Sequence, residues 1–219
     1  MIDQSQRGER DAGAVAGARG LRSPKERLLD AVIVHFTAAG LADQSLRRIA
    51  EAVGSSHRML LYHFGSKDGL LLAVVREVEA RTQAQFAAAS ASAGDRTEEL
   101  VRRMWAYVAD PALADFERLF FALYGRALQG DAATRPLLKG EIEDWLELQA
   151  ALAQRVGVPE ESARPHARLG LAVTRGLLLD LLATGDRAGV DAALDVFARN
   201  YAGRWWEVEA ANSDPARPR

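Results

Sequence analysis

The sequence predicts an all-α protein in two parts: an N-terminal domain of three helices and a larger helical domain, with about nine helices in total. Apolar residues recur at spacings of three and four along most of the chain, which is the period of an amphipathic helix. No alternating run of Val, Ile and Thr between turn residues indicates a strand. The chain has 219 residues, 48% of them hydrophobic, which is enough for one or two domains with a packed core.

The first helix is expected to open at Ser23, with Pro24 at its first position, and to end at Gly40. Proline suits this position because no bond within the helix needs its missing N–H group, and glycine suits the left-handed residue after a helix. One apolar stripe marks the buried face of this helix: Leu28, Leu29, Val32, Ile33 and Phe36.

Two short helices follow, joined by a tight turn. The second opens at Ser45, a good N-cap residue, and ends at Gly54. The third starts with Ser55 or Ser56 and runs to about Phe64. Two short helices around a glycine-containing turn are typical of a helix-turn-helix. Other helical hairpins share this pattern, so the side chains of the third helix must distinguish a DNA-binding helix-turn-helix from an ordinary hairpin.

The rest of the chain is expected to hold six more helices. The first of these is long, at 66–89, and glycines separate the segments after it, three of which start at a proline. The five later segments are 95–109, 111–129, 136–156, 159–184 and 187–207. The two ends of the chain lack helical periodicity and are expected to be a flexible arm, 1–22, and a disordered tail, 209–219.

The third helix carries side chains suited to reading DNA. A helix N-terminus presents unpaired N–H groups and a positive dipole end to phosphate, and its first turn can reach base edges in the major groove. Arg58 could bond a guanine through two N–H groups, and His57 or the nearby serines could donate to bases or phosphate. Tyr62 and His63 are expected to contact phosphate and fix the register. The alternative is that both are ordinary boundary residues of a helical domain.

A cation at the start of the next helix supports the first interpretation. Lys67 lies in the first turn of that helix, where a positive charge opposes the helix dipole unless an anion binds nearby. The expected DNA-binding residues are Ser45, Arg47, Arg48, Ser55, Ser56, His57, Arg58, Met59, Leu61, Tyr62, His63 and Lys67. In the arm, disorder is expected, although some arginines could add minor-groove or phosphate contacts: Arg7, Arg10, Arg19 and Arg22.

This segment resembles the DNA-binding domain of the tetracycline-repressor (TetR) family. That family typically shows Ser or Thr at the start of its second helix, then Ile-Ala, a Gly-Val-Ser-like turn, Leu-Tyr-x-His-Phe and a Ser-Lys pair. The matching residues are Ser45, Ile49, Ala50, Gly54, Ser56, Leu60, His63, Phe64, Ser66, Lys67 and Leu70. The stretch LLDAVIVHFTAAG is similar to the first helix of the family, so the resemblance covers Lys25 to Leu72, about 48 residues.

Two residues depart from the family pattern. Leu61 stands where the family has an aromatic residue, so one phosphate contact is expected to be lost, and Tyr62 could replace it. Ser55 stands where the turn usually has valine, which loosens the packing of the turn or adds a polar contact. Neither departure breaks the pattern.

The resemblance implies a second domain that binds a small molecule and forms a homodimer. The implied organisation is a helix-turn-helix DNA-binding domain at 23–70 and a helical ligand-binding and dimerisation domain at 71–208. After Leu169 the segment 159–184 is apolar on nearly every side, which predicts burial. We expect this segment and 187–207 to pair with their copies in a second subunit; the alternative is that they complete the core of a monomer. The expected interface residues are Leu177, Leu181, Leu194, Phe197, Tyr201 and Trp205.

A concentration of aromatic residues in the middle helices is the candidate small-molecule site. Ligand pockets are mostly apolar with a few polar anchors. The candidate residues are Met104, Trp105, Tyr107, Phe116, Phe120, Phe121, Tyr124 and Trp145, with His166, Arg175, Arg118 and Arg126 as candidate anchors. Each aromatic could instead be an ordinary core residue. A buried Arg175 could pair with Asp180 or with another carboxylate across the bundle.

Composition narrows the class of protein. The absence of cysteine excludes disulfides, thiolate metal sites and cysteine nucleophiles. No His-Glu-x-x-His, phosphate-binding glycine loop or nucleophile elbow occurs, so no catalytic residue, metal or cofactor is expected. The longest apolar stretch contains Arg175 and Asp180 and falls short of the ~20 residues of a membrane span. The first residues are polar and show no signal peptide, so we expect a cytoplasmic protein without a membrane partner.

Taken with the resemblance, these observations predict a dimeric, ligand-responsive transcriptional regulator and not an enzyme. We expect a repressor that binds a pseudo-palindromic operator in double-stranded DNA and is released by a small-molecule effector. The overall net charge of −2 does not favour general nucleic-acid binding, but residues 1–70 carry ten basic and eight acidic residues. The alternative is a helical ligand-binding or scaffold protein that has lost DNA binding.

Overall fold

The computed structural model describes residues 22–40, 44–91 and 97–212, and for residues 91, 97, 138, 139, 141 and 201–212 it describes the backbone alone. Within these residues the protein has nine α-helices, one short 3₁₀ helix and no strand, which confirms the predicted all-α class. The helices are α2 (Pro24–Ala39), α3 (Leu46–Ala52), α4 (His57–Phe64), α5 (Lys67–Ala91), α6 (Thr97–Val108), η1 (Pro111–Leu113), α7 (Ala114–Leu128), α8 (Leu137–Arg155), α9 (Glu160–Thr184) and α10 (Arg187–Asn212).

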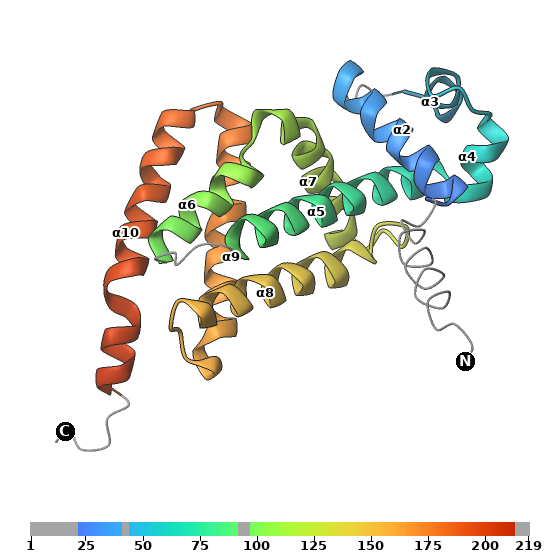
Figure 1. Ribbon diagram of the computed structural model, residues 1–219. Helices are drawn as coiled ribbons and strands as arrows, with labels where there is room; N and C mark the ends of the chain where they lie inside the picture. The colour runs from blue at the N-terminus through green and yellow to red at the C-terminus, as the bar shows by residue number, and fades with distance from the viewer. Residues whose placement is uncertain (1–21, 41–43, 92–96, 213–219) are drawn as a thin grey trace, which may run out of the picture.

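The molecule is elongated, with its small domain at one end. Figure 1 shows α2, α3 and α4 grouped together, and α5 running from this group into the larger domain. There α8 lies along α5, while α9 and α10 stand side by side at the opposite end, where α10 also packs against α6. The long helix α5 is therefore the element that the two domains share.

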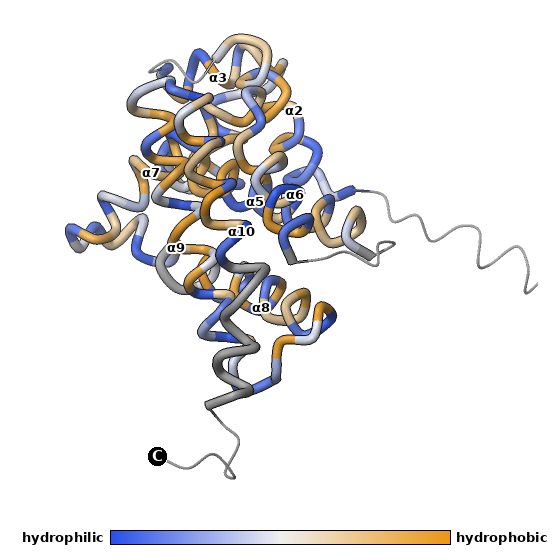
Figure 2. The backbone as a smooth tube through the Cα atoms, turned by 90° about the vertical axis from the view of Figure 1, so that its left-hand side faces the viewer, coloured by the Kyte–Doolittle hydropathy of each residue, from blue (hydrophilic) through white to orange (hydrophobic). Residues whose placement is uncertain are grey.

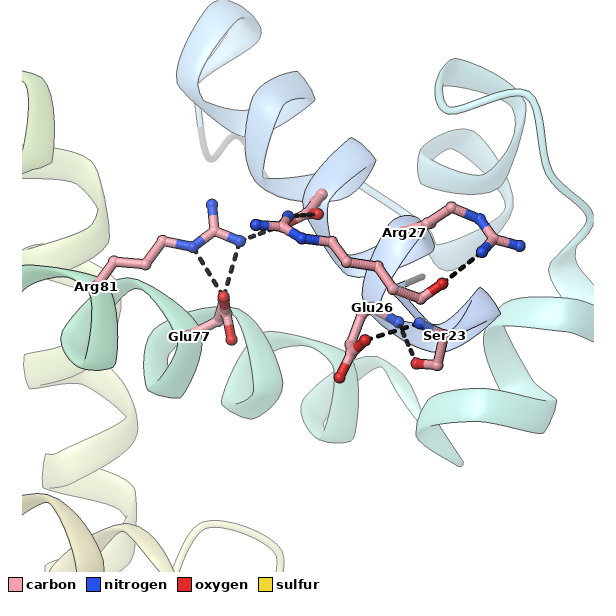
Figure 3. A network of polar contacts seen from close by, with 7 residues as sticks. Ser23, Glu26, Arg27, Glu77 and Arg81 are labelled. Carbon is pink, nitrogen blue, oxygen red and sulfur yellow. Dashed lines mark hydrogen bonds and ion pairs between the residues drawn. The ribbon is translucent and has the colours of Figure 1, made fainter. Parts of the chain in front are cut away.

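The first helix is fixed by a capping box at its N-terminus. The hydroxyl of Ser23 accepts a hydrogen bond from the backbone N–H of Glu26 at 3.2 Å, and the Ser23 backbone N–H donates to the Glu26 carboxylate at 2.7 Å. Figure 3 shows this reciprocal pair beside Arg27, whose guanidinium donates to the backbone oxygen of Arg22 at 2.5 Å. Two of the N–H groups that a helix leaves unpaired are satisfied in this way.

An ion-pair network joins α2 to α5. Arg81 on α5 pairs with Glu77 one turn earlier, at 2.8 Å, and also with Asp30 on α2 (Figure 3). Asp30 pairs with Arg22 as well. Arg22 is thus held against α2, contrary to the disorder expected for it, whereas the arginines expected at 7, 10 and 19 lie outside the described residues.

The core of the small domain includes one residue from the large domain. Apolar side chains of α2, α3, α4 and the first half of α5 bury one another, and Phe116 from α7 completes the cluster. The fully buried members include Val32, Leu60 and Leu70. Burying a side chain such as Phe116 stabilises the packed state by about 1.5–3 kcal/mol. The contact therefore holds α7 against the small domain.

Helix α7 runs antiparallel to the first half of α5. At one end of the pair, Arg126 donates two hydrogen bonds of 2.8 Å to Asp68. At the other end, Phe116 packs in the same cluster as Val78. Between them lies a small apolar cluster made of Leu72, Val75, Phe120, Leu123 and Leu137. The α5–α7 pair forms a continuous wall from the junction of the domains to the interior of the large domain.

Candidate DNA-binding surface and ligand cavity

Serine caps position both helices of the helix-turn-helix. The Ser45 hydroxyl accepts from the backbone N–H of Arg48 at 3.3 Å, and the Ser56 hydroxyl accepts from that of Met59 at 3.2 Å. Between the helices, Gly54 has a φ of +66°, a conformation that costs residues with a side chain about 1–2 kcal/mol. The turn residues therefore suit the tight connection that the sequence predicted.

The outer face of α4 is exposed and unusually rich in large side chains. Tyr62 is 79% exposed, and the apolar side chains of Met59 and Leu61 are exposed beside it. Single exposed apolar residues are common, but several on one short helix indicate a surface that contacts a partner. The other exposed residues of the expected set are Ser45, Arg47, Arg48, Ser56, His57 and Arg58. Arg47 lies 3.7 Å from Glu51, and both side chains remain largely exposed.

Three residues of the expected set are half-buried: Ser55, His63 and Lys67. The Nε2 atom of His63 is shielded from solvent and has no hydrogen-bond partner. Its ring lies in a groove between the small domain and α5, beside Phe64 and Tyr62. The structure thus turns part of His63 away from the exposed face of α4, where a phosphate contact was expected. Lys67 remains at the start of α5, next to Asp68.

A close approach of backbones sets the angle between α4 and α5. A Cβ atom at Gly69 would lie 2.1 Å from the carbonyl oxygen of Phe64, a distance that no side chain tolerates. The Ser66 hydroxyl accepts from the Gly69 N–H at 3.0 Å and caps α5 at the same place. Glycine is required here by space, because its backbone is helical and its φ is not positive.

The large domain contains a cavity among α5 to α9 that is polar at its centre. It has about 370 Å³ of empty space, part of it open to solvent. The lining residues are Glu79, Met104, Val108, Glu117, Phe120, Phe121, Trp145, Gln149, Leu171, Thr174, Arg175 and Leu178. Two carboxyl groups and one guanidinium group therefore face an otherwise apolar and aromatic space.

Among the lining residues of this cavity, two carboxyl groups face one guanidinium group. Trp145 Nε1 donates to the Glu79 carboxylate at 2.5 Å, and Arg175 attracts both carboxylates. Burial, followed by repulsion from Glu79, raises the pKa of Glu117 from its ordinary 4.5 to about 8. Burial also raises the pKa of Glu79, against the hydrogen bond from Trp145 and the charge of Arg175. The attraction of Arg175 for these two acids agrees with one of the two sequence alternatives, in which Arg175 meets a carboxylate across the bundle.

A second, apolar compartment adjoins the first. It has about 520 Å³ of empty space and shares the side chains of Met104, Gln149 and Thr174 with the first compartment. Its remaining lining is apolar except for His166. The Nε2 atom of Gln149, in the shared wall, is buried without a hydrogen-bond partner. The two compartments lie on either side of this shared wall and are together called the amphiphilic cavity below.

The structure brings together about half of the expected ligand residues. Met104, Phe120, Phe121, Trp145 and Arg175 line the first compartment, and His166 lines the second. The others line neither compartment: Trp105, Tyr107, Phe116, Tyr124, Arg118 and Arg126.

Most of these remaining residues have packing or ion-pair roles. Trp105 is a core residue whose Nε1 donates to Asp191 at 2.6 Å, and Tyr107 packs on Phe86. Tyr124 stacks on Phe120, and Arg118 pairs with Asp115 at 2.9 Å. The sequence did not lead us to expect the two cavity acids, Glu79 and Glu117. A signal for Glu79 was present, because it falls on the apolar stripe of α5 with Val75, Thr82 and Phe86, a placement that indicates burial.

The side of the molecule formed by α9 and α10 differs from expectation. Figure 2 looks onto this side, and the described residues leave Leu169, Leu179 and Val196 exposed there, with Leu179 51% exposed. Within the single chain α9 is therefore not buried on every side, and its expected pairing with a second copy stays a prediction. Leu194, an expected interface residue, is 3% exposed within the chain's own core and has no surface to offer a partner.

The other expected interface residues also face inward or lie outside the description. Leu177 and Leu181 are half-buried against the core of the large domain, and Phe197 lines the apolar compartment. The side chains of Tyr201 and Trp205 lie outside the described ones. An exposed stripe thus runs along α9 and α10, one face away from the residues chosen from the sequence.

Two structural searches of the described residues complete the description. No group of three or more His, Cys, Asp or Glu side chains among them is placed to hold a metal ion. None of the described helices is both long and apolar enough to cross a bilayer.

The small domain has the helix-turn-helix architecture of DNA-binding regulators, and comparisons with known proteins support this likeness. Residues 28–74 match the model of bacterial regulatory proteins of the TetR family. The HTH-type transcriptional regulator BetI of Stenotrophomonas maltophilia is 32% identical over 78 residues, which span 36% of this chain and 40% of that protein. The N-terminal domain is therefore similar to the DNA-binding domain of TetR-family transcriptional regulators, and the chain matches about two fifths of the length of this curated relative.

Solved structures extend the likeness to the fold of the whole chain. A TetR transcriptional regulator from Legionella pneumophila has a TM-score of 0.62 at 19% identity, with 84% of this chain and 99% of that chain covered. The multidrug binding protein EbrR, solved with imidazole, has a TM-score of 0.58 at 24% identity, with 84% and 94% covered. At these identities the likeness concerns the fold.

Proposed function

We propose that the protein is a homodimeric, cytoplasmic repressor that binds a pseudo-palindromic operator through α4 and is released by a small molecule. The exposed face of α4 carries the proposal. It presents Arg58, His57 and Tyr62 on a helix whose N-terminus is capped by Ser56 and is open to phosphate. Nothing within the small domain needs these side chains, because Leu60 on the opposite face already fills its core.

The exposed stripe on α9 and α10 supports dimerisation. Leu169, Leu179 and Val196 are exposed apolar residues of α9 and α10, which stand at the end of the molecule opposite the small domain. Two copies joined there would direct their small domains toward the same DNA duplex. A homodimer matches a pseudo-palindrome because both follow a two-fold axis, with the two α4 helices about 34–36 Å apart.

The amphiphilic cavity supports control by a small molecule. It is lined by α5, which also forms part of the small domain's core, so a ligand contacts the shared helix directly. EbrR, which has a similar fold, is named as a multidrug binding protein. A ligand that prefers one of two conformations by ~1–3 kcal/mol would shift operator affinity by about 5–150-fold.

Footprinting on the DNA upstream of the protein's own gene, at physiological salt, tests the proposal. We expect protection of a near-palindrome with two half-sites about one helical turn apart. If neither this DNA nor a random-sequence pool yields a bound site for a well-folded dimer, the repressor is ruled out. The remaining reading is then a helical ligand-binding or scaffold protein that no longer binds DNA.

A further inference from the structure

The amphiphilic cavity buries more negative than positive charge. Glu117 is 6% exposed and lines the cavity, where Glu79 repels its carboxylate and Arg175 attracts it. Glu79 has one donor, Trp145. The only cation lining this compartment is Arg175, whose guanidinium carbon lies 5.1 Å from the ring centre of Phe120 and 5.8 Å from that of Tyr124. One guanidinium group thus attracts two buried acids.

The pKa values of both acids are raised, which is consistent with two buried carboxyl groups sharing one cation. Burial and the neighbouring Glu79 raise the pKa of Glu117 to about 8, despite the attraction of Arg175. The protein therefore holds a proton on Glu117 at neutral pH, which offsets the missing positive charge. A ligand that brings its own positive charge could replace this proton.

The lining of the compartment also favours a cation over an anion. Trp145, Phe120 and Phe121 surround the acids, and aromatic faces attract cations by about 0.5–2 kcal/mol. An anionic ligand would have to lie against Glu79 and Glu117 in a site with little water, where like charges repel strongly. Arg175 is already attracted to these two acids, so it offers an anion little net charge.

We propose that the cavity binds an amphiphilic organic cation, with its charged group between Glu79 and Glu117 and its apolar part in the second compartment. The shared wall of Met104, Gln149 and Thr174 is where the ligand would pass from one compartment to the other. The binding itself is independent of DNA, and only its regulatory effect rests on the proposed function.

The two acids lie one residue away from the core of the DNA-binding domain. Val78 precedes Glu79 on α5, Phe116 precedes Glu117 on α7, and both apolar side chains are buried in the small domain's cluster. A cation that draws Glu79 and Glu117 together, or a bulky one that separates them, displaces Phe116 relative to Val78. The cation would thereby reposition the small domain without contacting it.

Binding of the cation is coupled to release of the proton from Glu117. The cation requires the ionised carboxylate, and below about pH 8 the free protein holds that group protonated. The affinity should therefore rise by up to about tenfold per pH unit toward pH 8 and level off above it. The charged groups facing Glu117 are Glu79 from α5 and Arg175 from α9.

Calorimetry with three aromatic probes on the full chain tests the proposal. The probes are benzyltrimethylammonium, benzyl alcohol and benzoate, which share a ring and differ in charge. We expect the cation to bind at least about tenfold more tightly than the other two, with proton release visible in buffers of different ionisation heat. Glu117→Gln should weaken cation binding at least about tenfold and reduce proton release to what Glu79 alone contributes. Glu147→Gln, an exposed acid on α8, is the matched control and should change neither.

Equal or tighter binding of benzyl alcohol or benzoate would overturn the proposal, and so would a cation affinity that does not change with pH. Failure of the cation to bind at millimolar concentration would do the same. A DNA-binding assay run in parallel separates the two proposals. Cation binding by a protein without an operator would refute the repressor alone, while operator binding without cation binding would refute the cation site alone.

Discussion

Neighbouring residues of α4 have different roles, because some are buried in the core of the small domain and others are exposed to solvent. Leu60 is fully buried and anchors the helix, while Arg58 and Tyr62, two positions away on either side, are exposed. Nothing in the fold restrains these exposed side chains in a way that would oppose their contact with DNA. Their contribution to stability should be small and their contribution to operator binding large.

Replacing Arg58 with alanine tests the reading of a base at this position. We expect Arg58→Ala to lose about 1–3 kcal/mol of specific operator affinity and to relax base preference at one position of each half-site. Arg118→Ala, an exposed arginine of α7, should leave both unchanged. Quantitative binding to the operator and to its single-base variants gives both numbers. Unchanged affinity and preference would remove Arg58 from the base-reading set.

The residues of the small domain could be predicted from the sequence because local rules decide them. Serine caps, glycine turns and the apolar stripe each act within a few residues, and the structure confirms the caps at Ser23, Ser45 and Ser56. The buried acids Glu79 and Glu117 could not be predicted in the same way. The apolar stripe of α5 indicates that Glu79 faces other helices, but the meeting of Glu79 with Glu117 and Arg175 depends on how α5, α7 and α9 pack.

At the scale of elements, the helix boundaries were predicted to within a few residues, and the packing faces of the last two helices were not. Prolines and glycines mark the ends of α7, α8 and α9 whatever lies around them. Helices α9 and α10 are apolar on more than one face, so the sequence does not say which face meets the core. The structure assigns Leu194 to the core and leaves Leu179 outside.

The junction of α4 and α5 depends on the absence of a side chain at Gly69. Gly69→Ala would place a methyl group 2.1 Å from the Phe64 carbonyl oxygen, so the two helices must separate. We expect a loss of stability of about 1–3 kcal/mol and a larger loss of operator affinity, because α4 turns relative to α5. Gly125→Ala, within α7 and with open space at its Cβ position, is the control. It should be neutral or stabilising by up to about 1 kcal/mol.

Urea unfolding and operator binding of both variants check this expectation. A Gly69→Ala protein as stable and as active as the unsubstituted chain would show that the junction is not fixed by this contact.

At the scale of the whole molecule, α5 runs from the small domain into the large one, and α9 and α10 stand at the far end (Figure 1), with Leu169, Leu179 and Val196 exposed on them. Two-fold symmetry through this stripe would double every site in the protein, including the cavity. A regulator built in this way needs both copies, because one α4 alone reads only half of a palindrome.

A charge in the stripe should separate the copies. We expect Leu179→Glu to yield a folded monomer with weakened operator binding, because Leu179 is 51% exposed in the single chain and would be buried between copies. Leu128→Glu, on the exposed end of α7, should remain a dimer. Sedimentation velocity measures the mass, and circular dichroism confirms the helices. A Leu179→Glu protein that stays dimeric would place the interface elsewhere.

Burying Glu117 beside a second carboxylate carries a thermodynamic penalty. An apolar residue of similar volume would relieve the repulsion from Glu79 and the loss of hydration, and would raise the melting temperature of the protein without its ligand. Random mutation would thus remove this acid readily wherever binding no longer mattered. If the cavity binds the proposed cation, Glu117 trades stability of the empty protein for affinity for its ligand.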